Sequence, residues 1–356
     1  MKCCTDFNIM RWAILPIFFL LTNSLFAQHD TTYYTEYNDK LIVSLHNSFV
    51  RQYDIAFNQN MIKDSTSKSA FHYYADANVV SGIELDYDIF SFSFNYKAVP
   101  PKDENKKGKS TYTDLGLNIC GHKWRMETSY KMYEGFYDIN TKNYTKPYYD
   151  SITPYYQNPH MSNSCTKAKF IYITKPEKFT YNAAYSCGAR QLRTSASWIF
   201  VGNLYYDQLN TDTSFVPGPL RKYYFDYSNF NGLNVIGLSV GFGFSANLVT
   251  KRHFFGNITL AVEPESQWRE YRFASGVSVK RNYLAASGDT RISFGYNGKK
   301  FFLFLSFLAD YSNYNSGQMK IKNNFASAST TIGYRFNVKK PKFYNDFEQT
   351  KVYKML

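Results

Sequence analysis

The feature that most constrains this fold is a repeated alternation of apolar and polar residues over segments of about ten residues. Within residues 232–249, the apolar residues Ile236, Leu238 and Val240 alternate with Gly and Ser. Within residues 89–99, Phe92 and Phe94 alternate with Ser and Asn. A period of two is typical of strands that have one apolar and one polar face. Because no stretch of 18 apolar residues follows the N-terminal region, the alternation predicts an all-β fold.

The alternation predicts twelve strands and leaves room for two more. The predicted strands lie near residues 71–87, 89–99, 112–123, 124–138, 167–175, 178–188, 194–207, 232–249, 252–272, 281–297, 299–314 and 324–338. Short turns at residues 121–124, 175–178, 250–253 and 297–300 fit one end of a barrel. If all four lie at the periplasmic end, two further strands are required, at residues 41–45 and 222–227. With twelve strands, the loop at residues 139–166 would fall on the periplasmic side.

Alternating strands fit either a soluble sandwich or a barrel that spans a membrane. Aromatic residues recur at strand ends, which fits the two interfaces of a bilayer. They are Tyr87, Trp124, Tyr130, Tyr296, Tyr311 and Phe336. The polar faces carry charges of both signs at mid-strand. These charged candidates for the lumen are Glu84, Arg125, Glu127, Asp289, Arg291 and Arg335. We therefore predict an antiparallel transmembrane β-barrel of 12 to 14 strands, whose lumenal charges pair with one another.

The N-terminus indicates export. Lys2 and Arg11 precede an apolar run at residues 13–21, which is too short to span a bilayer and is followed by small residues. We predict a signal peptide over residues 1–27, cleaved after Ala27; the alternative is a retained anchor. The predicted organisation is a periplasmic lead-in at 28–40, an outer-membrane barrel at 41–338 and a tail at 339–356. The predicted location is the cell outer membrane.

The last predicted strand resembles the recognition strand read by the barrel assembly machinery. Thr331, Gly333, Phe336 and Val338 follow its polar-x-Gly-x-x-apolar-x-apolar spacing. The chain departs from the usual pattern by continuing to Leu356 beyond this strand. The resemblance implies that this machinery is a partner.

The net charge and the cysteine content limit which partners, metals and cofactors we expect the chain to bind. The formal net charge is +13, and an exported basic chain meets anionic lipid and lipopolysaccharide rather than nucleic acid. After removal of the signal, Cys120, Cys165 and Cys187 remain, without the spacing of a disulfide framework or a zinc site. We predict no metal and no cofactor, and the oligomeric state is left open.

Residues 178–202 resemble the strand–loop–strand hallmark of domain-of-unknown-function family 4421, a group of exported Bacteroidota proteins. The matching positions are Phe179, Tyr181, Ala183, Ala184, Gln191, Ser195 and Ser197. Residues 107–119 and 130–137 are similar to two further blocks of the family. The resemblance covers most of the mature chain and implies an outer-membrane barrel, with no known activity, substrate or catalytic residue.

The function predicted from the sequence is a channel, a porin-like transporter or a structural component of the cell surface. The alternatives are an outer-membrane enzyme that modifies lipid or glycan, and a surface protein whose Tyr- and Asn-rich loop at residues 140–164 binds glycans or other partners. The six histidines are His29, His46, His72, His122, His160 and His253. None sits in a recognisable Ser/His/Asp motif, so no catalytic residue is predicted and an enzyme is the less favoured hypothesis.

Overall fold

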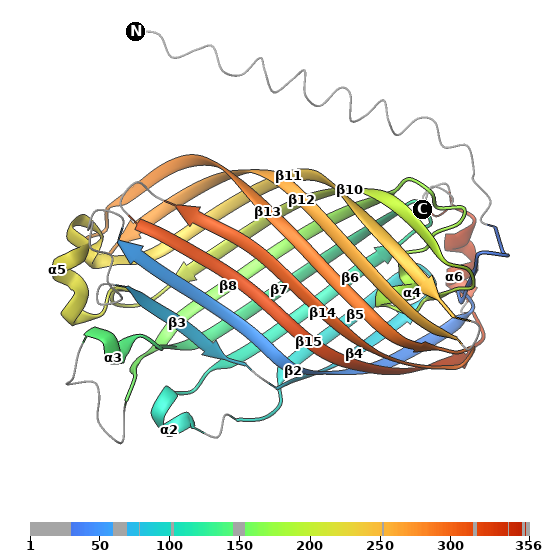
Figure 1. Cartoon of the computed structure of the whole chain (residues 1–356), viewed down its shortest axis with the longest axis horizontal. Helices are drawn as coiled ribbons and strands as arrows, with labels where there is room; N and C mark the ends of the chain where they lie inside the picture. Colours follow the sequence, from blue (N-terminus) through green and yellow to red (C-terminus); the bar gives the residue numbers. More distant parts are fainter. Residues whose placement is uncertain are drawn as a thin grey trace, which may run out of the picture.

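The computed structural model is a closed antiparallel barrel (Figure 1). It describes residues 30–59, 70–77, 79–100, 103–144, 154–250, 253–315, 319–340, 342–350 and 353. The predicted signal peptide at 1–27 lies outside these residues. The barrel strands are β2 (Lys40–Gln59), β3 (Phe71–Asp76), β4 (Val80–Tyr87), β5 (Phe90–Lys97), β6 (Thr111–Cys120), β7 (Trp124–Asp138), β8 (Tyr156–Ile173), β10 (Ser195–Asn210), β11 (Phe230–Val249), β12 (Phe254–Phe273), β13 (Ser278–Asn297), β14 (Phe301–Asn315) and β15 (Met319–Asn337).

The barrel has twelve strands, because β3 and β4 follow each other along β2 and together make one of them. Each other strand pairs with its neighbours in chain order, and β15 pairs with β2 from Asn337↔Lys40 to Met319↔Gln59. This last pairing closes the sheet. Short elements lie at the two ends of the barrel: β1 (Tyr34–Glu36), β9 (Ala189–Gln191), α2 (Glu104–Lys107), α3 (Thr141–Tyr144), α4 (Asn182–Tyr185), η1 (Gly218–Leu220), α5 (Arg221–Tyr224), η2 (Phe225–Asn229) and α6 (Lys342–Glu348).

The two ends of the barrel differ. The terminal end carries Lys40 of β2, Asn337 of β15, α4 and α6, while the loop end carries α2, α3 and α5 (Figure 1). The four short turns predicted to share one end all lie at the terminal end. Residues 139–144 and 154–155, which belong to the loop at 139–166 that a twelve-strand count would place with those turns, lie at the loop end.

Two predicted strands are wrong, and their loss explains the strand count. Residues 178–188 form a connection that contains α4, and residues 222–227 form parts of α5 and η2. The predicted strand at 41–45 is confirmed as part of β2. The segment at 178–188 alternates like a strand, but its side chains pack inside the barrel instead of against lipid. A barrel of twelve strands is therefore compatible with all four short turns lying at one end.

The outer surface is apolar over most of its height. Val240 and Phe242 of β11 are 64% and 63% exposed, whereas Ser239, the residue before Val240, is 2% exposed. The predicted apolar faces of β5, β6, β11, β13 and β15 likewise point outward. Exposed aromatic residues form one row near the terminal end and another toward the loop end. The first includes Tyr172, Trp198, Phe254, Phe301 and Tyr334, and the second Tyr96, Tyr206, Trp268 and Tyr311. An apolar band between aromatic rows is the surface of a barrel that spans a bilayer.

No helix among the described residues is both long enough and apolar enough to cross a membrane.

One predicted face is wrong near the start of the barrel. Within the predicted strand at 71–87, a single alternation puts Ala75 and Ala77 on the same face as Ile83 and Leu85, which point outward, but both alanines are fully buried in the lumen. The break between β3 and β4 changes the phase of the alternation. A bulge at Phe49 changes the phase of the paired strand β2 at the same height, since Ser48 and Val50 pair with consecutive residues of β15. The shift places Tyr53, Ile55 and Phe57 of β2 and Phe71, Tyr73 and Ala75 of β3 in the lumen at the loop end.

The N-terminal segment is attached to the terminal end through β1. Strand β1 pairs with β9 at the terminal end, from Tyr34↔Gln191 to Glu36↔Ala189. The Glu36 carboxylate also accepts from Nδ1 of His122, in the turn between β6 and β7, at 3.0 Å. This contact raises the pKa of His122 above its ordinary value.

We expect Arg in place of Val240 to destabilise the barrel by about 2–4 kcal/mol, because it puts a charge in the lipid-facing band. The Val240→Leu variant is the matched control and should fold as the wild type does. Urea unfolding of both variants in lipid vesicles measures the difference. Equal stability of the two variants would contradict the assignment of this face to lipid.

We expect Glu36→Gln to lower the pKa of His122 toward about 6.5, because the variant loses the carboxylate that favours the protonated ring. Since the folded-state pKa is raised, the contact stabilises the protein below the unfolded pKa and is lost as pH rises through the folded value. An NMR titration of His122 in both proteins checks this. A His122 pKa unchanged by the substitution would show that the contact does not form in solution.

Candidate functional site

The loop end of the lumen is filled by an aromatic plug. The connection at residues 211–229, called here the mouth plug, folds into the barrel, and its Phe215, Leu220 and Tyr224 are almost fully buried. The Phe215 ring lies 5.9 Å from that of Phe57. The Tyr73 hydroxyl donates to the Phe215 carbonyl oxygen at 2.8 Å. Aromatic packing of this kind excludes water from the loop end.

The terminal end is filled by a second connection, residues 174–194, called here the terminal plug. It contains α4 and β9, and its Phe179 and Cys187 are fully buried. Burial raises the pKa of the Cys187 thiol to about 12, so the thiol is neutral at physiological pH. Gln191 organises the plug: its side-chain amide donates to the carbonyl oxygens of Lys178 and Tyr33, and its side-chain oxygen accepts from the Thr180 backbone N–H.

The barrel wall holds the terminal plug mainly by hydrogen bonds to plug carbonyl groups. Arg335 of β15 donates to the Cys187 carbonyl oxygen at 2.7 Å and 3.2 Å. Asn297 of β13 donates to the carbonyl oxygens of Ala183 and Ala189. The Arg335 guanidinium is also 4.0 Å from the Tyr37 ring centroid. These contacts fix the backbone of the plug through wall residues of two strands.

A polar chamber, called here the central chamber, lies between the two plugs. It consists of a cavity of about 290 Å³ and an adjoining one of about 130 Å³ toward the mouth plug. Lys131, Lys167 and Asp310 line both cavities. None of the three has an ion-pair partner within 4 Å among the described residues. Both amines and the carboxylate are therefore available to a solute in the chamber.

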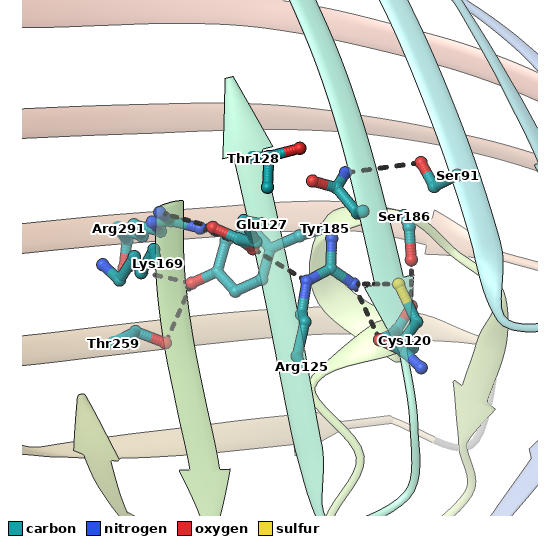
Figure 2. Close-up of polar contacts among 12 residues, drawn as sticks. Ser91, Cys120, Arg125, Glu127, Thr128, Lys169, Tyr185, Ser186, Thr259 and Arg291 are labelled. Carbon is teal, nitrogen blue, oxygen red and sulfur yellow. Dashed lines mark hydrogen bonds and ion pairs between the residues drawn. The ribbon is translucent and has the colours of Figure 1, made fainter. Parts of the chain in front are cut away.

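A network of charges crosses the lumen beside this chamber (Figure 2). Glu127 of β7 accepts from Arg125 on its own strand at 2.7 Å and from Arg291 of β13 at 3.0 and 3.2 Å. Asp289 of β13 accepts from Arg291 at 3.3 Å and from Lys169 of β8. Strands β7 and β13 are not neighbours in the sheet. The network therefore braces opposite walls.

The same network contacts the terminal plug. Arg125 donates to the side-chain oxygen of Asn182 at 2.8 Å and to the Cys120 sulfur at 3.0 Å. The Tyr185 hydroxyl lies within hydrogen-bonding distance of Asn257, of Thr259 at 3.0 Å and of the Arg291 carbonyl oxygen at 3.4 Å. Figure 2 shows Arg125 between Glu127 on one side and Cys120 on the other. Movement of α4 would therefore change the contacts of Arg125 and Arg291, two charged residues of the network.

Polar groups also crowd the opposite wall. Glu263 of β12 accepts from Ser239 at 2.6 Å and from Asn203, and Arg269 lies 4.0 Å from the Tyr283 ring centroid. The small residues of β11 make room here, because a Cβ at Gly237 would lie 2.2 Å from the Tyr205 ring. The Gly- and Ser-rich face of this strand therefore lines a crowded lumen.

Of the six charged residues predicted to face the lumen, five lie at or beside the central chamber and one lies at the terminal plug. Arg125, Glu127, Asp289 and Arg291 form the cross-lumen network, and Glu84 lines the central chamber and accepts from Ser91 at 2.8 Å. Arg335 lies apart from them, at the terminal plug. Asp289 binds Arg291, two residues along the same strand. Arg291 also binds Glu127 across the lumen, so the charge most dependent on Asp289 is Lys169.

Sequence analysis missed Lys167 and Lys169 and the inward side chains of the terminal plug. The two lysines alternate with Ala168 and Phe170, so the period of two was enough to place them in the lumen. The plug gave no such signal, because residues 178–188 alternate as a strand does. Among the described residues, no three His, Cys, Asp or Glu side chains are grouped to hold a metal ion.

The model of a family described as domain of unknown function (DUF4421) matches residues 28–336. The chain belongs to this family, as the resemblance of residues 178–202 predicted. No curated protein matches the chain.

Solved structures similar to the chain include three outer-membrane proteins. The outer membrane protease OmpT from Escherichia coli is 8% identical with a TM-score of 0.39, covering 85% of this chain and 98% of its own. An outer membrane channel from Pseudomonas putida F1 is 11% identical with a TM-score of 0.36, covering 87% and 100%. The P. putida toluene transporter TodX is 8% identical with a TM-score of 0.27, covering 85% and 91%. We draw no functional conclusion from a likeness of this degree.

We expect Asp289→Ala to destabilise the barrel by about 3–5 kcal/mol, because it leaves the Lys169 ammonium buried without its carboxylate. Adding Lys169→Met should restore part of that loss. Adding Lys280→Met instead should not restore the loss, because the Lys280 side chain is exposed. Unfolding free energies of the single and double variants check this, and a loss in the Asp289–Lys169 double variant equal to the sum of its singles would exclude coupling.

Proposed function

We propose that this DUF4421 member is an outer-membrane barrel that carries a small polar solute through the central chamber by displacing its plugs. The apolar outer band supports integration into a bilayer. A barrel is the architecture that outer-membrane proteins use to satisfy their backbone groups in lipid. The predicted signal peptide supports export to that membrane.

The observation that carries the proposal is the polar chamber that lies along the barrel axis between two plugs. A lumen serving only as a structural support is expected to be filled by side chains. Here the larger cavity alone, at about 290 Å³, has the volume of roughly ten water molecules. A solute of that size fits without widening the barrel.

The chamber offers charges of both signs. The available amines of Lys131 and Lys167 and the Asp310 carboxylate face the same space. Such a lining does not select simple ions of one sign. It favours a small solute that carries hydrogen-bonding groups or both charges.

Among the described residues, no disulfide joins either plug to the barrel wall. Cys120, Cys165 and Cys187 are free thiols, and the terminal plug is joined to the wall by hydrogen bonds and packing. Such contacts break and re-form more readily than a disulfide. Displacement of the plugs is therefore the step that would open a path.

Planar-bilayer conductance of the purified protein tests the proposal. We expect the wild type to show brief, discrete conductance steps. Replacing residues 180–188 by a Gly/Ser linker of equal length should lengthen them, and replacing residues 214–227 as well should give continuous conductance. The reason is that the first change removes the terminal plug and the second the mouth plug.

A matched control replaces the exposed residues 274–277 by a linker of equal length. It should leave conductance unchanged, because the contact of this turn with the mouth plug is the backbone N–H of residue 274 to the Asn229 carbonyl oxygen, which a Gly/Ser linker keeps. If the double replacement conducts while the wild type never does and passes no solute into vesicles, the barrel is a closed structural component. That result would contradict transport.

A further inference from the structure

A third cavity lies at the terminal end, beneath the terminal plug. Its volume is about 310 Å³, and we call it the vestibule. It is bounded by the β4–β5 turn, the β6–β7 turn, α4 and the C-terminal tail. The residues that line it include Glu36, Asp86, Asp88, Phe90, Glu348 and Tyr353.

The vestibule is acidic, and three of its four carboxylates are paired. Glu36 binds His122 at 3.0 Å. Asp88 accepts from the hydroxyls of Tyr344 at 2.7 Å and Tyr353 at 2.5 Å. Glu348 binds Lys340. The first two contacts attach β1 and the tail to the barrel, and the third lies within the tail, so these carboxylates serve the fold.

The fourth carboxylate, Asp86, is different. It is 4% exposed, and neither of its oxygens has a hydrogen-bond partner among the described residues. Ser91, which faces it across the β4–β5 pair, donates to Glu84 instead. The Arg125 guanidinium is occupied by Glu127, Asn182 and Cys120.

An unpaired buried carboxylate is unfavourable unless something in the adjoining space compensates it. Asp86 lines the vestibule, so the compensating group can come from there. The lining also includes Ile89, Phe90 and Tyr353. A carboxylate beside aromatic and aliphatic side chains suits an ammonium group on a short apolar body, because the ring faces attract cations.

We propose that the vestibule binds a small organic ammonium ion, with Asp86 as the anchoring carboxylate and with Phe90 and Tyr353 in contact with its apolar part. Asp88, whose partners Tyr344 and Tyr353 are neutral, adds a second acidic group that attracts such a cation. Binding here does not require that any solute cross the barrel.

Calorimetric titration of the full mature protein in detergent micelles tests the site, with n-butylammonium as the probe and n-butyrate as the probe of opposite charge. We expect saturable binding of the ammonium ion alone. Asp86→Asn should weaken it at least about tenfold, because a hydrogen bond to a charged group is lost. Asp103→Asn, which removes an exposed carboxylate at the loop end, is the matched control and should leave the affinity unchanged.

A second variant keeps the test decisive if Asp86→Asn does not fold. Tyr353→Leu leaves Asp86 in place and removes one ring, and it should weaken binding about threefold. The proposal is overturned if the wild type does not bind n-butylammonium, which would mean that Asp86 holds a proton only. It is equally overturned if n-butyrate binds as tightly, or if every variant that folds, Tyr353→Leu included, keeps the wild-type affinity. Conductance can fail while this binding holds, so the two proposals are tested separately.

Discussion

Every backbone N–H and C=O group of a strand that faces lipid must be hydrogen-bonded within the protein, because lipid offers no partner and each unpaired group costs several kcal/mol. The pairing of β15 with β2 meets this requirement for the last open edges of the sheet. Closure then fixes the rest: one face of every strand meets lipid, and the other meets a lumen that only side chains and connections can fill. The apolar band, the buried charges and the plugs follow from it.

Charges in the lumen compensate one another across the lumen as well as along single strands. Glu127 joins cations of β7 and β13, and Asp289 joins cations of β13 and β8. Such contacts are costly to break because each leaves a charge unpaired in a confined space. They hold the walls at a fixed separation and support α4 of the terminal plug. The mouth plug uses aromatic packing instead, so the two ends are closed by different interactions.

Much of the architecture could be predicted from sequence, because the period of two records directly which side chains meet lipid. Val240 and Ser239 were placed on the correct faces for this reason. The same rule failed at Ala75 and Ala77, where a bulge in β2 and a break after β3 reverse the phase, since neither has a sequence signal of its own. It failed again at residues 178–188, whose alternation describes packing inside the barrel. The partners of the lumenal charges, such as Arg291 for Glu127, depend on which strands face each other across the lumen, and this is set only by closure.

The central claim is that two plugs enclose a polar chamber at rest. Cys165 lines the smaller cavity of that chamber, so its reaction with a membrane-impermeant thiol reagent, located by mass spectrometry, tests the claim directly. The account predicts that Cys165 of the wild type in lipid vesicles reacts slowly, and that it reacts rapidly once both plugs are replaced by linkers. Rapid labelling of Cys165 in the wild type would contradict it, because the chamber would then already be open to water along the barrel axis.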